Sequence, residues 1–195
     1  MQEDDQALVK RSQEGELDAF NRLVERYQGR VFGLAYSMLG NRAAAEDATQ
    51  ESFTSAYRNI RGFRGGSLRA WLLRIASNAC IDVIRSSKRR QETSLEAATQ
   101  DTGFDVPSTE ESPEDYAMRN ELRQEIQLGL ESLPEDQRLA VTLVDIQGLD
   151  YEEAAGAMGT SLGTLKSRLS RGRFRLRDYL LQRQELLPHE FRLAK

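Results

Sequence analysis

"YEEAAGAMGTSLGTLKSRLSRGRFRLRDYLL", residues 151–181, is the stretch that decides the fold of this chain. Ala155 is a small residue at a position where a second helix must pack closely, and Gly159, four residues later, can adopt the positive φ of a sharp turn. Ser161 can cap the helix that follows, and Leu165 falls on the inward face of that helix. This spacing predicts a helix-turn-helix.

The second half of the stretch concentrates positive charge, although the whole chain carries 27 Lys+Arg against 31 Asp+Glu. Arg-rich helical turns can bind phosphates, and small residues in the opening turns (Gly163, Thr164, Ser167) would let the helix enter a major groove. A solvated surface helix is the alternative, but such helices usually interleave Glu with their cations. Nucleic-acid binding is therefore favoured by six cations with no acid among them: Lys166, Arg168, Arg171, Arg173, Arg175 and Arg177.

Composition limits the remaining possibilities for the 195 residues. Only four prolines occur, and apolar residues recur mostly at three- and four-residue spacing, which predicts an all-α protein. We expect a cytoplasmic location without membrane insertion, because no secretory signal follows Met1 and no apolar run approaches the roughly 20 residues of a membrane span. Cys80 and His189 are the only cysteine and histidine, so we expect no disulfide, no metal site and no cofactor.

Residues 91–115 differ from the rest of the chain and read "QETSLEAATQDTGFDVPSTEESPED", with eight acids and no Lys or Arg. Such a segment buries too little apolar surface to offset its ordering entropy, so we predict a flexible linker over residues 91–111. Without these eight negative charges, the net charge changes from -4 to +4, so the rest of the chain is basic. Two interpretations of the linker remain open: a solvated spacer, or a segment whose charge imitates nucleic acid in a basic channel.

The linker divides the chain into two predicted helical domains, residues 1–90 and 112–181, followed by a tail, residues 182–195, to which we assign no role. In the first domain, Gly15 should stop a short helix and Gly40 should end a long one. A third helix should cover residues 43–60. Ser67 should cap a fourth, which carries these apolar residues on or near one face: Leu68, Leu72, Ile75, Ala79 and Val83. In the second domain, a helix over residues 114–132 should precede one opened by Pro134.

Several motifs follow one another in a recognisable order: "EDATQESFTSAYRNIRGFRG", "AWLLRIASNACIDVIR" and, after the linker, "LESLPEDQRLAVTLVDIQGLDYEEAAGAMGTSLGTLKSRLSRGRFRLR". In their order and spacing, over residues 5–181, the chain resembles an extracytoplasmic-function (ECF) sigma factor of bacterial RNA polymerase. The resemblance implies an alternative sigma factor, monomeric when free, that binds core polymerase and promoter DNA. It further implies transcription initiation in response to stress or envelope signals, under the control of an anti-sigma protein.

The resemblance also assigns residues of the first domain, called region 2. It implies that the polymerase clamp binds Asp47, Gln50, Glu51 and Phe53; the first three share one helical stripe. Non-template bases of the minus-ten element would contact Phe63, Arg64, Trp71, Arg74 and Asn78. Asn78 matches the base-reading asparagine of the family, and an amide offers both donors and an acceptor to the edge of an extruded base. Core packing for Trp71 and a local capping role for Asn78 are the alternatives.

In the second domain, region 4, the resemblance assigns nine residues to the minus-thirty-five element: Tyr151, Glu152, Ser161, Thr164, Lys166, Ser167, Arg168, Ser170 and Arg171. Two departures from the family pattern bear on promoter specificity. The loop before Trp71 is about one residue shorter than in well-known members, and Val144 replaces an arginine that often contacts the promoter.

Two other functions are compatible with parts of the pattern. An ordinary helix-turn-helix regulator would use the first domain for dimerisation or effector binding and would recognise a symmetric operator on its own. A metal-dependent nuclease would need Asp47 and Glu51 as ligands, without a supporting histidine, so we do not expect an enzyme. A sigma factor differs from both in requiring core polymerase.

Overall fold

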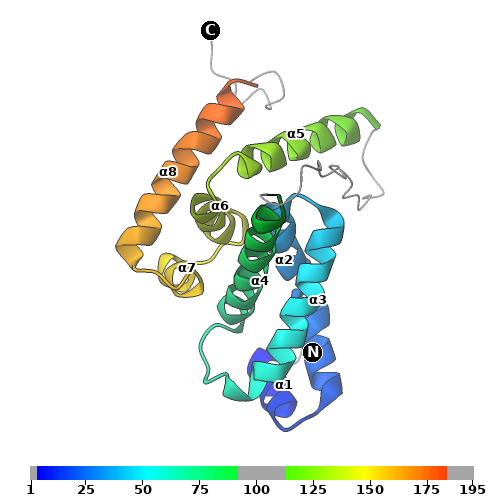
Figure 1. The fold of residues 1–195 in the computed structure, drawn as a ribbon. Coiled ribbons are helices and arrows are strands. Elements are labelled where there is room, and N and C mark those ends of the chain that lie inside the picture. The colour runs from blue at the N-terminus through cyan, green and yellow to red at the C-terminus, as the bar shows by residue number, and fades with distance from the viewer. Residues whose placement is uncertain (1–3, 92–112, 184–195) are drawn as a thin grey trace.

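The computed structural model describes residues 4–91 and 113–183, and within these ranges the regular structure is entirely helical (Figure 1). The prediction of an all-α fold is confirmed. The predicted linker and tail lie almost wholly outside the described residues. No helix in the described ranges is long and apolar enough to cross a membrane.

The N-terminal domain is built from α1 (Asp5–Gln13), α2 (Leu17–Leu39), α3 (Arg42–Asn59) and α4 (Leu68–Gln91), with a short 3-10 turn, η1 (Ile60–Gly62), after α3. The predicted helix boundaries are confirmed at the turns. Gly15 and Gly40 take φ values of 99° and 69°, which side chains other than glycine rarely adopt. The Asn41 side chain accepts a hydrogen bond from the Ala44 amide at 2.9 Å and so caps α3.

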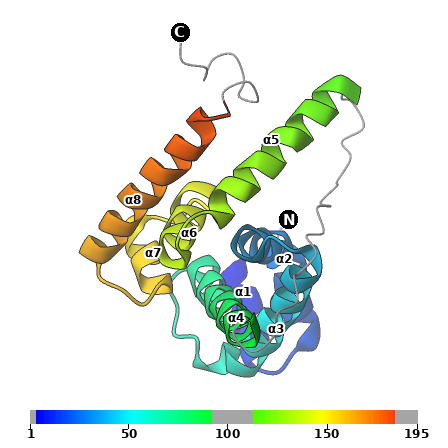
Figure 2. The same ribbon diagram turned by 45° about the horizontal axis from the view of Figure 1, so that its top comes forward.

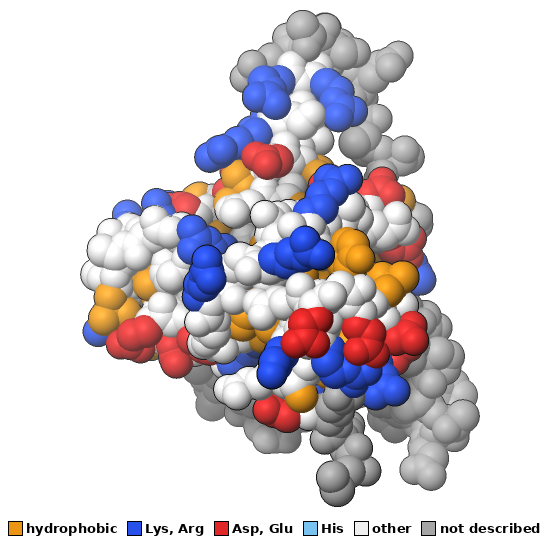
Figure 3. Space-filling model, turned by 90° about the horizontal axis from the view of Figure 1, so that it is seen from below, with side chains coloured by type: hydrophobic (Ala, Val, Ile, Leu, Met, Phe, Trp, Pro, Cys, Tyr) orange, Lys and Arg blue, Asp and Glu red, His pale blue; other side chains and the backbone are white. Residues whose placement is uncertain are grey.

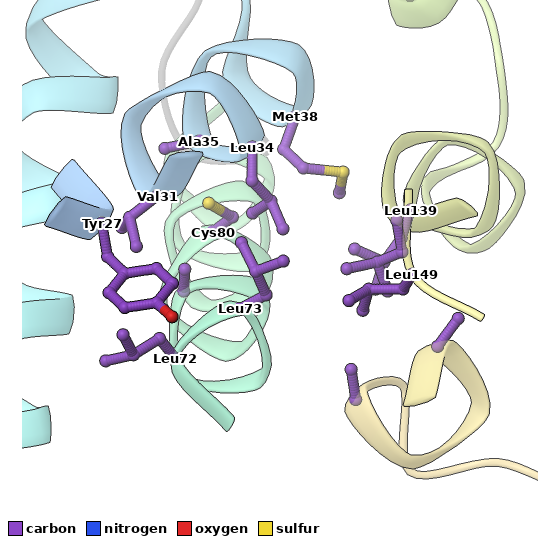
Figure 4. Packing of buried hydrophobic residues seen from close by; sticks show 14 of the residues in the cluster. Tyr27, Val31, Leu34, Ala35, Met38, Leu72, Leu73, Cys80, Leu139 and Leu149 are labelled. Atoms are coloured by element: carbon purple, nitrogen blue, oxygen red, sulfur yellow. The ribbon is translucent and has the colours of Figure 1, made fainter. Parts of the chain in front are cut away.

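The buried stripe of α4 differs from the predicted one. Leu72 is buried as expected, but Ile75 is only half-buried, as are Ala79 and Val83. The side chains that face α2 are instead Leu72, Leu73 and, further along, Cys80 (Figure 4). The reason is that α4 packs against α2 and α3 together, so the line through Ile75 falls at the edge of the contact and borders α3.

The C-terminal domain contains α5 (Pro113–Glu131), α6 (Glu135–Val141), a π-helical turn η2 (Thr142–Ile146), α7 (Tyr151–Ala157) and α8 (Leu162–Leu181). The predicted helix-turn-helix is confirmed: Gly159 has a φ of 61°, and Ser161 accepts a hydrogen bond from the Thr164 amide at 3.2 Å. Leu165 is completely buried. Figure 2 shows α5 extending away from the other helices.

The two domains pack against each other, and no motif in the sequence predicted this contact. Helices α2 and α4 contact α5, α6, η2 and α7. Leu139 and Leu149 face Met38 and Leu73 across this boundary (Figure 4), and all four are nearly inaccessible to solvent. A hydrogen bond also crosses the interface: Arg138 Nη1 of α6 donates to the Met38 main-chain carbonyl of α2 at 2.6 Å. The N-terminal and C-terminal domains therefore share one continuous core in this arrangement.

Candidate polymerase and nucleic-acid interface

The first candidate surface is the outer face of α3. Asp47, Gln50 and Glu51 are exposed there, as a partner-binding stripe requires. The opposite face of α3 carries small residues that let it lie close to its neighbours in the domain. Phe53 is on that inner face with 8% of its surface exposed. Its ring packs in the core of the N-terminal domain, so Phe53 lies behind the stripe rather than on it.

The second candidate surface is the loop between α3 and α4, residues 63–67, which we call the capture loop. Gly65 and Gly66 have φ values of 100° and 88°, so the chain makes its turn in a conformation that favours glycine. At the start of the loop, the Phe63 ring lies 5.3 Å from the Trp71 ring between centroids. At its end, Ser67 accepts a hydrogen bond from the Ala70 amide at 3.2 Å and caps α4 as predicted. Trp71 therefore supports the loop and is only half-buried.

A hollow of about 540 Å³ lies beside the capture loop. Its walls come from α1, from Tyr27 of α2 and from the loop itself, including Phe63 and Arg64. Arg26 pairs with the Asp5 carboxylate, which lines the hollow, and Lys10 and Arg64 are exposed on the surface of the hollow. Burial and a hydrogen bond to Asp5 raise the pKa of Tyr27 to about 12, so the phenol stays protonated and donates a hydrogen bond to the Asp5 carboxylate.

Asn78 is exposed near the middle of α4, in a groove of about 190 Å³ between α3 and α4. Among the described residues, its side chain makes no hydrogen bond, so the alternative of a local capping role finds no partner there. Glu51 of the α3 stripe lines the same groove. The predicted polymerase-binding and minus-ten residues therefore adjoin each other. Arg74 is exposed one helical turn before Asn78.

The third candidate surface is α8, which lies at the outer edge of the molecule in both Figure 1 and Figure 2. Lys166, Ser167, Ser170 and Arg171 are all exposed on this helix. The Lys166 ammonium lies 5.9 Å from the ring centroid of Tyr151, at the start of α7. The predicted minus-thirty-five residues of α7 and α8 are thereby brought together, with Glu152 exposed in the first turn of α7 and Ser161 and Thr164 in contact at 2.9 Å.

The six cations of α8 do not share one environment. Arg168 Nε lies 2.9 Å from Asp136 of α6, and Arg173 makes two hydrogen bonds to Asp145 of η2 at 3.0 and 2.6 Å. The two hydrogen bonds that Arg173 donates to the Asp145 carboxylate raise the pKa of Arg173. Sequence reasoning treated all six cations as one group, because the acids that pair with two of them lie about 30 residues away, on other helices. Arg168 and Arg173 therefore help to hold α8 on the domain.

The lower face of the molecule shows how its charge is distributed (Figure 3). Basic side chains stand there in several separate groups, and acidic side chains lie among them. The basic character of the two domains is thus not gathered into one patch on this face. This distribution suits separate binding sites better than one continuous nucleic-acid track.

Comparison with known proteins assigns the two domains that carry these surfaces to one protein family. Residues 23–90 match the family model of sigma-70 region 2, and residues 123–176 match that of sigma-70 region 4. The chain is 40% identical over 174 residues to the ECF RNA polymerase sigma-E factor of Escherichia coli, covering 87% of this chain and 90% of that protein. It is also 40% identical over 165 residues to the ECF RNA polymerase sigma factor SigE of Mycolicibacterium smegmatis, covering 84% of this chain but 62% of that longer protein.

Solved structures show the same likeness. The sigma factor RpoE of Bartonella quintana, in complex with the anti-sigma factor NepR, superimposes with a TM-score of 0.69 at 27% identity, over 83% of this chain and 96% of that one. CnrH in complex with the cytosolic domain of CnrY gives a TM-score of 0.64 at 24% identity, over 90% and 96% of the two chains, which is a likeness of fold.

Proposed function

We propose that this chain, which belongs to the extracytoplasmic-function sigma factors of bacterial RNA polymerase, binds core polymerase and directs it to promoters through two separately read elements. One observation carries the proposal: a single chain holds both a helix-turn-helix with exposed cations and, in another domain, an exposed carboxylate stripe beside Asn78, whose amide has no hydrogen-bond partner among the described residues. An ordinary helix-turn-helix regulator needs only the first of these features. In this proposal the core enzyme catalyses RNA synthesis, and this chain catalyses no step of it.

The polymerase would bind the outer face of α3. Asp47, Gln50 and Glu51 supply two carboxylates and an amide on one exposed stripe, which fits a basic partner helix. Phe53 contributes by anchoring α3 in the core of region 2, so that the stripe keeps its orientation. Replacing Phe53 should therefore weaken binding through loss of structure, whereas replacing the three polar residues should weaken it directly.

The minus-ten element would bind at the capture loop and along the groove of Asn78. A base that leaves the stack costs a few kcal/mol, and a site repays that cost by stacking and by hydrogen bonds to the base edge. Asn78 offers an amide without a described partner, and the hollow beside Phe63 and Arg64 offers space next to a cation. This arrangement supports recognition of a separated strand rather than of intact duplex.

The minus-thirty-five element would bind α8 as duplex, with the N-terminal turns of the helix in the major groove. Lys166, Ser167, Ser170 and Arg171 are the exposed residues of those turns. Arg168 and Arg173 have their charge engaged by Asp136 and Asp145, so we assign them first to holding α8 in place.

The closed packing of the two domains has a consequence for this function. The centres of elements near minus ten and minus thirty-five lie about 25 base pairs apart, or about 85 Å at about 3.4 Å per base pair. The domains are in direct contact here, with Arg69 of α4 donating to the Gly148 carbonyl at 3.0 Å. A closed chain cannot reach both elements, so binding to polymerase must separate the domains.

An anti-sigma protein is the further partner that we propose. In a similar structure, the sigma factor RpoE of Bartonella quintana is bound to the anti-sigma factor NepR. A partner of this kind would hold the chain inactive until a stress or envelope signal releases it. Because the released chain would act on core polymerase, we place the action of this chain in the cytoplasm.

Co-elution with core polymerase tests the proposal. The wild-type chain should co-elute with core enzyme, and the double variant Asp47→Ala/Glu51→Ala should lose most of that binding. The matched control is Asp18→Ala/Glu25→Ala, which removes two exposed acids of the same domain from α2. Equal binding by all three proteins would remove the α3 stripe from the proposal. A wild-type chain that does not bind core enzyme but binds a symmetric operator on its own would favour the alternative of an ordinary helix-turn-helix regulator.

A further inference from the structure

Gln13, the last residue of α1, makes an unusual long-range contact. Its Nε2 group donates to the Ile60 carbonyl at 3.0 Å and to the Phe63 carbonyl at 2.9 Å. These two residues lie 47 and 50 positions further along the chain, at the beginning of η1 and at the first residue of the capture loop. A side-chain amide nitrogen carries two hydrogens, so one amide can satisfy both carbonyl oxygens at once.

The capture loop has few other restraints of its own. Gly65 and Gly66 have open space around them, since a Cβ atom at either position would meet no atom within 4 Å. Glycine also costs the most conformational entropy to order. The backbone entering the loop is held by the Phe63 amide, which donates to the Ile60 carbonyl at 3.1 Å, and then by Gln13. Gln13 thus joins α1 to the point where the loop begins.

We propose that Gln13 is a positioning residue for minus-ten recognition: it fixes the start of the capture loop so that Phe63 and Arg64 face the promoter strand. The inference rests on the proposed function of the loop. Gln13 itself lines the hollow together with these two residues. Helix α1 precedes residue 23, where the match to sigma-70 region 2 begins, so this assignment adds a helix to the site.

The chain provides its own probe of the loop. Trp71 is the single tryptophan, and its ring contacts the ring of Phe63. Quenching of tryptophan fluorescence by acrylamide therefore reports the packing of the loop without any partner present. Gln13→Leu removes the donor, and Gln13→Glu keeps the size but turns a carboxylate toward two carbonyl oxygens. The matched control is Gln28→Leu, which replaces an exposed glutamine of α2 in the same domain that does not line the hollow.

In both Gln13 variants, quenching of Trp71 should increase, and open-complex formation by the holoenzyme should fall by about 5- to 30-fold, the loss expected for two hydrogen bonds. The preference for the correct minus-ten base should fall with it, while binding to core polymerase and to a minus-thirty-five duplex stays unchanged. Gln28→Leu should behave as wild type. Gln13→Asn keeps the amide but shortens its reach, and it serves the same test if Gln13→Leu does not fold.

Two outcomes separate the possible failures. Quenching of Trp71 that is unchanged in every Gln13 variant would overturn the positioning role. Increased quenching with unchanged promoter opening and base preference would show that the loop does not read the minus-ten element, and the proposed function of the loop would then fail first.

Discussion

The pairing of cations on α8 leads to a quantitative prediction about salt. Lys166 and Arg171 are exposed and, among the described residues, have no acidic partner, whereas Arg173 is held by Asp145 through two hydrogen bonds. Arg175 and Arg177 are also exposed without such a partner. Only cations that neutralise phosphates release counterions from DNA, so the two classes should differ in their effect on the salt dependence of binding.

Each phosphate contact contributes about 0.9 to the slope of log affinity against log salt concentration. A fourfold rise in salt, from about 50 to about 200 mM, then weakens binding about 3.5-fold for each contact and about 150-fold for four contacts. Lys166→Ala should reduce the slope by about 0.9, and Arg171→Ala should do the same, if each binds a phosphate. Arg173→Ala should leave the slope nearly unchanged, because its charge is already engaged.

Fluorescence anisotropy with labelled promoter DNA and the assembled holoenzyme, at four salt concentrations, measures these slopes. Asp145→Asn provides a test of opposite sign, since it frees Arg173 and should steepen the slope by up to about 0.9. Equal changes for Arg173→Ala and Lys166→Ala would refute the division into paired and unpaired cations. Unchanged slopes in all four variants would show that α8 does not contact phosphates.

Three other predictions follow from the packing. Gly172→Ala places a methyl group 2.8 Å from a side-chain atom of α6 and should lower the free energy of unfolding by about 1–3 kcal/mol. Gly29→Ala, in the middle of α2, places its methyl group where no atom lies within 4 Å and should raise the free energy of unfolding by up to about 1 kcal/mol. Urea denaturation measures both changes. Asn78→Ala should slow open-complex formation and relax preference at a single minus-ten base while sparing core binding; lost stability with unchanged base preference would make the asparagine structural. Fluorophores on cysteines introduced at Ser87 and Ser132 should move apart by tens of ångströms when core polymerase is added, and unchanged energy transfer would contradict domain opening.

The labelling experiment is practical because of the environment of Cys80. This thiol is completely buried, and its burial raises its pKa to about 12. It therefore stays protonated at neutral pH and is shielded from reagents, so introduced surface cysteines should react selectively.

Local sequence signals predicted the helix ends and the helix-turn-helix well. Gly15, Gly40 and Gly159 all adopt positive φ values, and Ser161 caps α8, because these devices depend on residues within one turn of each other. Which residues of α4 are buried was harder to predict. Ile75 fits a helical stripe with Leu72, but the position of two neighbouring helices decides which residues are buried.

Long-range contacts had no local signal at all. Arg173 pairs with an acid 28 residues away, and Gln13 binds carbonyl groups 47 and 50 residues away. Phe53 matches a family motif whose other members face outward, yet helical geometry places its ring inside. The contact between domains, such as that of Arg138 with Met38, depends on two surfaces that no single motif describes.

Run-off transcription with purified core polymerase tests the central claim most directly. The template should carry a promoter with both elements, and matched templates should lack either the minus-ten or the minus-thirty-five element. We predict a specific transcript only when core enzyme, this chain and both elements are present together. A specific transcript from core enzyme without the chain, or none from the complete reaction on promoters taken from the native genome, would contradict the assignment of this protein as a sigma factor.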